Sequence, residues 1–173
     1  SEFELVEEAE NKHVYELKYN DATMAMYPYK FVLRLIYLLE GTSVKITYEV
    51  KSVDDNPIYF QLGTHPGFMC PFDATHQLTD YYLEFSQQET LTRYFASKQN
   101  LIIHDKQAQI LTADSILPLS AETFYDGALI FRDIRSSSLT LKNRLNDRFV
   151  CLSWENFPYL GVWQPKDAPF LCL

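Results

Sequence analysis

Short runs in which apolar and polar residues alternate recur along the chain, and this two-residue period constrains the fold more than any other feature. The clearest runs, Phe31–Glu40 and Ser43–Lys51, flank Gly41-Thr42 and predict two long strands joined by a tight turn. In the second run the alternation puts the apolar residues on one face of the strand: Val44, Ile46, Tyr48 and Val50. Lys45, Thr47, Glu49 and Lys51 take the other face, so one face is expected to look inward and the other outward.

Other runs rich in β-branched and aromatic residues predict further strands. They are Phe3–Glu7, Val14–Tyr19, Ile58–Leu62, Tyr81–Phe85, Leu91–Phe95, Ala128–Phe131, Ser138–Leu141, Phe149–Trp154 and Tyr159–Trp163. Asp, Asn and Pro clusters separate them, as in Asp54–Pro57, and about eleven strands are expected. Because helical stripes are scarce, the pattern favours an all-β fold, an antiparallel β-sandwich or barrel.

Composition narrows the class of protein. A chain of 173 residues with 47% hydrophobic content can bury a core, so we expect one globular domain over residues 1–173. The net charge of −8, without a basic cluster, argues against a nucleic-acid partner. The apolar stretch Phe31–Leu39 contains Arg34 and is much shorter than the roughly 20 residues of a membrane helix. No membrane partner is therefore expected.

The cysteines and the chain ends suggest where the protein lies. Cys70, Cys151 and Cys172 form an odd set without Cys-x-x-Cys spacing, which is typical of free thiols in a reducing compartment. The acidic start lacks the features of a secretory signal, so a cytoplasmic location is expected. The chain begins inside a strand pattern and ends on an apolar run, Phe170–Leu173, which suggests an interior fragment, incomplete at both ends.

Few motifs carry recognisable chemistry. The four histidines, His13, His65, His76 and His104, match no compact metal-binding spacing, and no metal ion is expected. Neither a phosphate-binding glycine loop nor a Gly-x-Ser-x-Gly elbow is present. Nucleotide-dependent and serine-hydrolase functions therefore have no support.

The segment Gln61–Pro71 is the most informative, because an apolar run leads into His65 followed at once by Pro, Gly and a second Pro. Proline after His65 disfavours helix and fixes the backbone near the imidazole. A histidine held at a strand end can act as a general acid or base near neutral pH. A hydrogen-bonded turn histidine is the alternative.

Two further positions could contact a ligand. Asp126 directly precedes the apolar run Ala128–Phe131 and could accept hydrogen bonds from ligand hydroxyls, although Asp-Gly is also a common turn sequence. Trp154, Tyr159 and Trp163 could offer ring faces to a sugar. In a chain with 12 Tyr and 12 Phe, such aromatic residues are also common in a core.

Four segments together resemble the galactose mutarotase-like, or aldose 1-epimerase, family, and most closely its lactose-operon-encoded subgroup. They are Tyr27-Pro-Tyr-Lys-Phe31, the strand pair through Val50, the segment His65–Pro71 and Tyr159-Leu-Gly-Val-Trp-Gln-Pro165. The resemblance spans nearly the whole chain. It implies a large antiparallel β-sandwich, the supersandwich, whose groove binds a monosaccharide.

The resemblance also implies a mechanism without metal or organic cofactor. A carboxylate removes the proton of the anomeric hydroxyl while a histidine protonates the ring oxygen, and the open aldehyde rotates and recloses as the other anomer. His65 matches the acid histidine, and Asp126 resembles a hydroxyl-binding aspartate. Trp163, in the last matching segment, is expected to bind substrate.

Other residues of the family's site are missing from this chain. The resemblance places a second histidine and an arginine before Ser1, and the base glutamate directly after Leu173. His13 and Glu155 do not match those positions. Without the base, a fragment would lose about 10²–10⁴-fold in rate.

We therefore expect an aldose 1-epimerase acting on a hexose or a hexose phosphate. A phosphate would need cationic partners, for which Arg34, Arg93, Arg132, Arg135 and Arg148 are candidates. A non-catalytic sugar-binding module of the same fold is the alternative, since function depends on the site rather than on the fold. A purely structural β-domain would leave the His65 segment unexplained.

Overall fold

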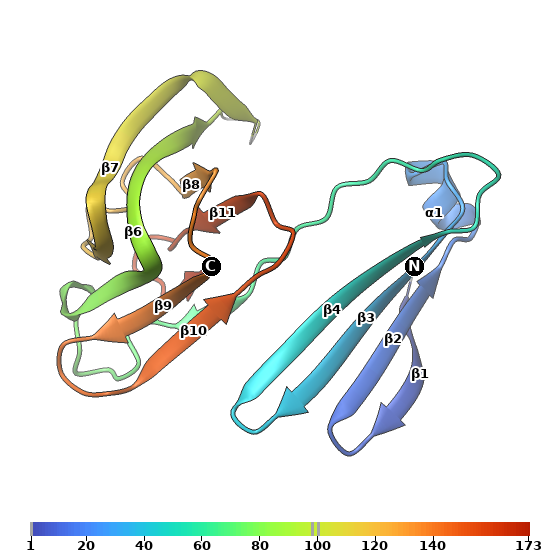
Figure 1. The fold of residues 1–173 in the computed structure, drawn as a ribbon, viewed down its shortest axis with the longest axis horizontal. Helices are drawn as coiled ribbons and strands as arrows, with labels where there is room; N and C mark the ends of the chain where they lie inside the picture. The colour runs from blue at the N-terminus through green and yellow to red at the C-terminus, as the bar shows by residue number, and fades with distance from the viewer. Residues whose placement is uncertain (1, 98, 100) are drawn as a thin grey trace. The chain divides into compact units, whose positions relative to one another are not determined.

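The computed structural model describes residues 2–97, 99 and 101–173, and it divides into two compact units, residues 1–62 and 63–173. Each unit is built from antiparallel strands (Figure 1). Twelve strands are found in the described part of the chain, close to the eleven expected. The single domain predicted from length stays a prediction.

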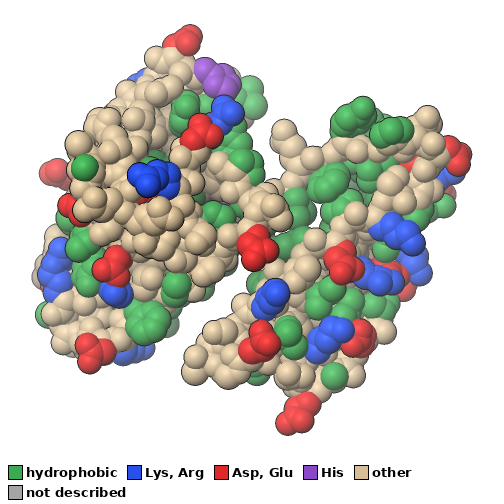
Figure 2. All heavy atoms as spheres, viewed as in Figure 1, with side chains coloured by type: hydrophobic (Ala, Val, Ile, Leu, Met, Phe, Trp, Pro, Cys, Tyr) green, Lys and Arg blue, Asp and Glu red, His purple; other side chains and the backbone are tan. Residues whose placement is uncertain are grey.

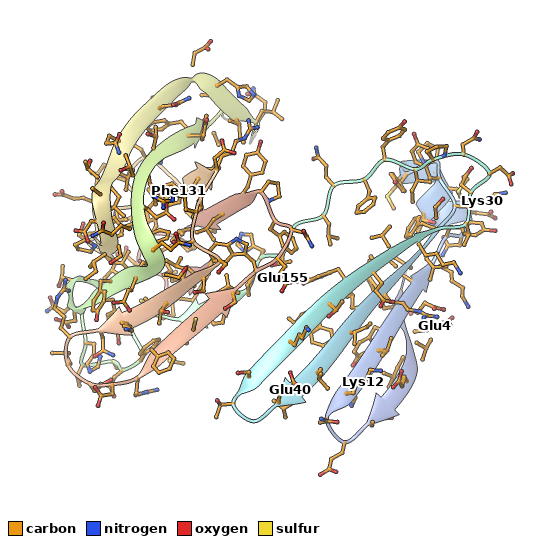
Figure 3. All side chains as sticks on the ribbon, in the orientation of Figure 1. Glu4, Lys12, Lys30, Glu40, Phe131 and Glu155 are labelled. Atoms are coloured by element: carbon orange, nitrogen blue, oxygen red, sulfur yellow. The ribbon has the colours of Figure 1, made fainter. Side chains whose placement is uncertain are left out.

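Unit 1 is a meander of four strands in the order β1-β2-β3-β4. Its elements are β1 (Glu4–Ala9), β2 (Lys12–Lys18), α1 (Asp21–Met26), β3 (Phe31–Glu40) and β4 (Ser43–Ser52). The predicted hairpin is confirmed, since Glu40 pairs with Ser43 and Gly41 takes the positive φ (59°) that this tight turn requires. Glu40 marks this hairpin in Figure 3.

Helix α1 was not predicted from the sequence. Asn20 caps it: the Asn20 side chain accepts a hydrogen bond from the Thr23 N–H (3.0 Å), and the Thr23 hydroxyl accepts one from the Asn20 N–H (2.8 Å). This reciprocal capping satisfies two backbone donors of the first turn. A pair of residues that reads as a turn, Asn20-Asp21, is therefore the start of a six-residue helix.

Unit 2 contains a six-stranded sheet and a two-stranded one. Its elements are β5 (Gly67–Met69), the 3₁₀ turn η1 (Leu78–Asp80), β6 (Tyr81–Ala96), β7 (Ile102–Pro118), β8 (Leu129–Arg132), β9 (Ser138–Asn143), β10 (Phe149–Ser153), β11 (Tyr159–Val162) and β12 (Phe170–Cys172). The large sheet has the order β10-β9-β6-β8-β11, with β7 also paired to β6, and β5 pairs with β12.

Three strand predictions are wrong. Ile58–Leu62 is irregular; it follows Pro57, and the Tyr59 carbonyl accepts a hydrogen bond from the Tyr27 hydroxyl (2.6 Å) rather than from a neighbouring strand. Tyr81–Phe85 and Leu91–Phe95 are not two strands but parts of one, β6, whose register shifts across residues 84–89. Polar residues there form a bulge where the sequence suggested a break.

Strand β12 falls in the apolar run noted at the end of the sequence, whereas two other strands were not predicted, β5 and β7. Strand β7 has 17 residues, but it pairs only with β6 among the described strands, and register shifts interrupt its alternation. Strand β5 has only three residues. It begins with Gly67 directly after Pro66, and glycine and proline both weaken a strand pattern. Both are too irregular for periodicity to reveal.

The hydrophobic core cluster lies within unit 2, between Cys70 and Leu173. The buried face of β6 supplies Tyr81, Leu83, Phe85 and Leu91, while β8 and β9 supply Leu129, Phe131, Leu139 and Leu141. Phe131 is fully buried and lies among packed side chains in Figure 3. The Tyr81 hydroxyl, also buried, accepts a hydrogen bond from the Phe72 N–H (2.6 Å) and contacts His76 Nδ1 (2.8 Å).

The outer surface carries acidic and basic side chains interspersed over the visible face of each unit (Figure 2). None of the helices in the described ranges is long and apolar enough to cross a bilayer.

We predict that Glu16 makes unit 1 sensitive to acid. The carboxylate is 6% exposed and lies 2.7 Å from Arg34 Nε and 3.1 Å from Lys18 Nζ. These two partners, Arg34 first, lower the pKa of Glu16. A lowered pKa in the folded state means that the stabilisation is present above the unfolded pKa, about 4.3, and is lost as pH falls through the folded value.

Thermal unfolding midpoints between pH 7 and pH 3 should therefore fall less steeply for Glu16→Gln than for the parent chain. Glu10→Gln, at the exposed turn after β1, removes the same charge elsewhere and is the matched control. Parallel curves for Glu16→Gln and the parent would contradict the prediction.

Candidate active site

His65 lies on the extended segment that enters β5, and its side chain is exposed. The imidazole meets the edge of the Trp163 ring, with ring centroids 6.4 Å apart and an interplanar angle of 81°. Pro66 and Gly67 follow, and Gly67 begins the pairing with β12. The structure thus brings together two of the three predicted site residues.

Strand β12 holds this arrangement in place. Trp163 and Cys172 exchange two backbone hydrogen bonds, with N···O distances of 3.0 and 2.7 Å. On its other side β12 pairs with β5, and the Leu173 N–H donates to the Pro66 carbonyl (3.2 Å). Residue 173 therefore lies beside the backbone that carries His65, although it is more than one hundred residues away in sequence.

Asp126 lies on the turn before β8, at the same end of the strand pair β8–β11 as Trp163. Leu129, the first residue of β8, pairs with Val162, the residue before Trp163. Gly127 has a positive φ of 88°, and its N–H donates to the Phe124 carbonyl (3.0 Å). The Asp126 side chain is exposed, so a ligand can reach it. The ladder ends thus bring all three predicted residues to one edge of unit 2.

Arg93 donates hydrogen bonds to the backbone of the turn that contains Asp126. Its Nη2 lies 3.0, 3.3 and 3.0 Å from the carbonyl oxygens of residues 126, 127 and 128. From the sequence, Arg93 was predicted only as one of several candidate partners of a phosphate. The alternation of β6, which puts Arg93 on the buried face with Leu91 and Phe95, is the signal that could have revealed this role.

The other candidate cations are in different surroundings. Arg34 contacts Glu16, Arg132 contacts Asp133 (3.5 Å), and the guanidinium of Arg148 lies over the Phe72 ring. Arg135 is exposed. No pair of these arginines is joined by a common partner in the described structure, so nothing in the geometry selects a phosphate site.

The four histidines occupy separate places. His13 is in β2 near Glu8, His76 contacts the buried Tyr81 hydroxyl, and His104 is exposed on β7. Within the described ranges no three His, Cys, Asp or Glu side chains gather as a possible metal site. Glu155 is exposed, just after β10.

A hollow of about 460 Å³ lies beside Met69 at the end of β5 and Phe170 at the start of β12. Its lining is mostly apolar: Met69, Pro71, Asp73, Ala74, His76, Pro169 and Phe170. His65 and Trp163 do not line it, so it is separate from the candidate site.

Comparisons with known proteins identify the family of the chain. Residues 1–171 match the family described as aldose 1-epimerase. The chain belongs to the aldose 1-epimerase family. It is 29% identical over 176 residues to the protein LacX, chromosomal, of Lactococcus lactis subsp. lactis, and the match covers 99% of this chain and 58% of LacX. The plasmid form of LacX matches equally well.

Solved structures of similar proteins share the fold. A galactose mutarotase related enzyme from Lactobacillus acidophilus has a TM-score of 0.89 and 27% identity, over 99% of this chain and 58% of that one. A galactose mutarotase-like protein from Lactobacillus casei has a TM-score of 0.86 and 23% identity, over 98% and 59%. The predicted antiparallel β fold of the galactose mutarotase-like type is confirmed. The chain spans 58% of the length of the curated relatives it matches.

We predict that the three thiols differ sharply in reactivity. Cys151 is exposed, whereas Cys70 and Cys172 are buried. Burial raises the pKa of Cys70 to about 12 and raises that of Cys172 as well. Because the thiolate is the reactive form, iodoacetamide at pH 8 should label only Cys151 in the folded protein, as read by peptide mass spectrometry.

Labelling of all three after denaturation in guanidinium is the internal control. Equal labelling of Cys172 and Cys151 before denaturation would show that the Cys172 thiol is not buried in solution.

Proposed function

We propose that the protein to which this chain belongs is an aldose 1-epimerase that interconverts the α and β anomers of a hexose or hexose phosphate. Membership of the aldose 1-epimerase family supports the reaction class. The observation that carries the proposal is the position of His65: it is exposed, fixed by Pro66, and beside both Trp163 and Leu173.

His65 is the general acid of the proposed mechanism. Its exposed imidazole can reach the ring oxygen of a bound pyranose, and protonation there weakens the bond to the anomeric carbon. The proton of the anomeric hydroxyl leaves to a carboxylate base as the ring opens. The aldehyde then rotates about the C1–C2 bond, and the reverse proton transfers close it as the other anomer.

The base is proposed to be the glutamate that family resemblance places directly after Leu173. The hydrogen bond from the Leu173 N–H to the Pro66 carbonyl supports this, because Leu173 directly precedes the proposed glutamate and Pro66 directly follows His65. In this proposal the acid lies just before β5 and the base just after β12, and the pairing of these two strands restricts the separation of acid and base. The second histidine and the arginine are proposed to precede residue 1.

Asp126 and Trp163 bind the substrate in this proposal. The Asp126 carboxylate accepts hydrogen bonds from sugar hydroxyls, and such charge-assisted bonds are stronger than neutral ones. Trp163 is 37% exposed and offers an apolar face to the C–H groups of the ring. Its edge contact with His65 also restrains the imidazole.

Two-dimensional exchange NMR on the full-length protein tests the reaction, with glucose, galactose and their 6-phosphates as substrates. We expect exchange between anomers of at least one sugar to exceed the buffer rate. Line broadening without faster exchange would identify a sugar-binding module instead. If neither effect appears with any of the four sugars, the proposal fails.

We predict that His65→Ala in the full-length protein lowers kcat at least about 10²-fold with a modest change in KM, because a general acid acts mainly in the transition state. Anomeric exchange over a range of sugar concentrations gives both constants. His104→Ala, which removes an exposed histidine from β7, is the matched control and should keep the parental rate. Equal rates for His65→Ala and the parent would remove His65 from catalysis.

A further inference from the structure

Arg93 occupies a position where a cation is costly. It lies on the buried face of β6 between Leu91 and Phe95, and it is 4% exposed. Burial lowers the pKa of its guanidinium, while the negative charge of Asp126 acts in the opposite direction. Buried charges are normally retained only where specific partners compensate for lost hydration.

The partners of Arg93 are backbone carbonyls rather than a carboxylate. In the described structure Arg93 Nη2 donates to the carbonyl oxygens of residues 126, 127 and 128. Its Nε is buried and has no partner in the described structure, and the guanidinium carbon lies 4.4 Å from the centre of the Phe95 ring. The hydrogen bonds of Arg93 Nη2 therefore all run to one short stretch of backbone.

That stretch contains the turn that carries Asp126. Gly127 in this turn has a φ of 88°, and the carbonyls of the residues on either side of it both accept hydrogen bonds from Arg93. Strand β8 itself pairs with β6 at only one position, Tyr94 with Ile130. In the described structure the hydrogen bonds of Arg93 therefore make much of the attachment of the 126–128 backbone to β6.

The inference follows from this arrangement and rests on the proposed function. We propose that Arg93 is a positioning residue for sugar binding, which acts by fixing the Asp126 turn so that the Asp126 carboxylate faces the substrate. Arg93 does not touch the sugar. This role differs from that of a phosphate ligand, because the side chain is buried and its Nη2 already donates to the turn.

Arg93→Met is the informative substitution, because Met keeps an unbranched stem and has no donor. In the full-length protein we expect KM for the sugar to rise at least about 10-fold, with kcat within about 3-fold of the parent value. Loss of folded protein alone would lower the apparent kcat and leave KM unchanged. Arg93→Lys keeps three donors on a shorter stem and should raise KM by only about 3-fold.

A double-mutant cycle tests the route through Asp126. If Arg93 acts by placing that carboxylate, Arg93→Met should change KM by less than about 2-fold once Asp126→Asn is present. Effects that multiply in the double variant would show that Arg93 acts independently of Asp126 and would overturn the inference.

Arg144→Met is the matched control. Arg144 also donates to a backbone carbonyl, that of Thr79 (3.1 Å), and lies over an aromatic ring, Tyr82, but it is exposed and away from the Asp126 turn. Its substitution should leave KM unchanged. If Arg93→Met does not fold, as judged by circular dichroism, Arg93→Lys carries the test alone.

A parental KM in Arg93→Met, or in Arg93→Lys where that variant carries the test, overturns the inference and leaves the proposed function standing. A parent protein that neither accelerates exchange nor broadens the sugar signals fails in the proposed function itself, and the inference fails with it. The two failures are therefore distinguished by the parent measurement.

Discussion

Strand β6 is the element on which unit 2 depends, because it pairs with β7, β8 and β9 and supplies much of the buried core. Its length of 16 residues is divided by the bulge at residues 84–89. Before the bulge β6 pairs with β9, and after it β6 meets β8. One strand thereby organises two parts of a sheet, and the bulge is the device that redirects it.

Two ionisable side chains on the buried face of β6 hold the chain on either side of β8. The Glu89 carboxylate accepts a hydrogen bond from the Ser136 N–H (2.6 Å), after β8, and Arg93 donates to residues 126–128, before it. Since β8 shares a single backbone pair with β6, these contacts replace part of a ladder. The candidate site therefore depends on buried polar contacts as well as on apolar packing.

Much of the fold could be predicted because the alternation is regular where strands are regularly paired, as in Phe31–Glu40, whose bounds are confirmed. The errors fall where another interaction outweighs periodicity: reciprocal capping at Asn20, a bulge in β6 and register shifts in β7. For the site, rigidity after His65 could be read from Pro66. The contact of Leu173 with Pro66 could not, because pairing between residues so far apart follows from the tertiary fold.

The parity of charged residues offers a more general signal. Positions 89 and 93 have the same parity as Leu83, Phe85, Leu91 and Phe95, and Glu89 and Arg93 are buried like them despite the bulge. A charge at such a position must find partners or destabilise the fold, and in both cases the partner is the backbone of a connection. Those connections lie before and after β8, and the connection before β8 carries Asp126. A charge that breaks an apolar face thus marks a loop whose conformation is fixed, which is what a substrate-binding turn requires.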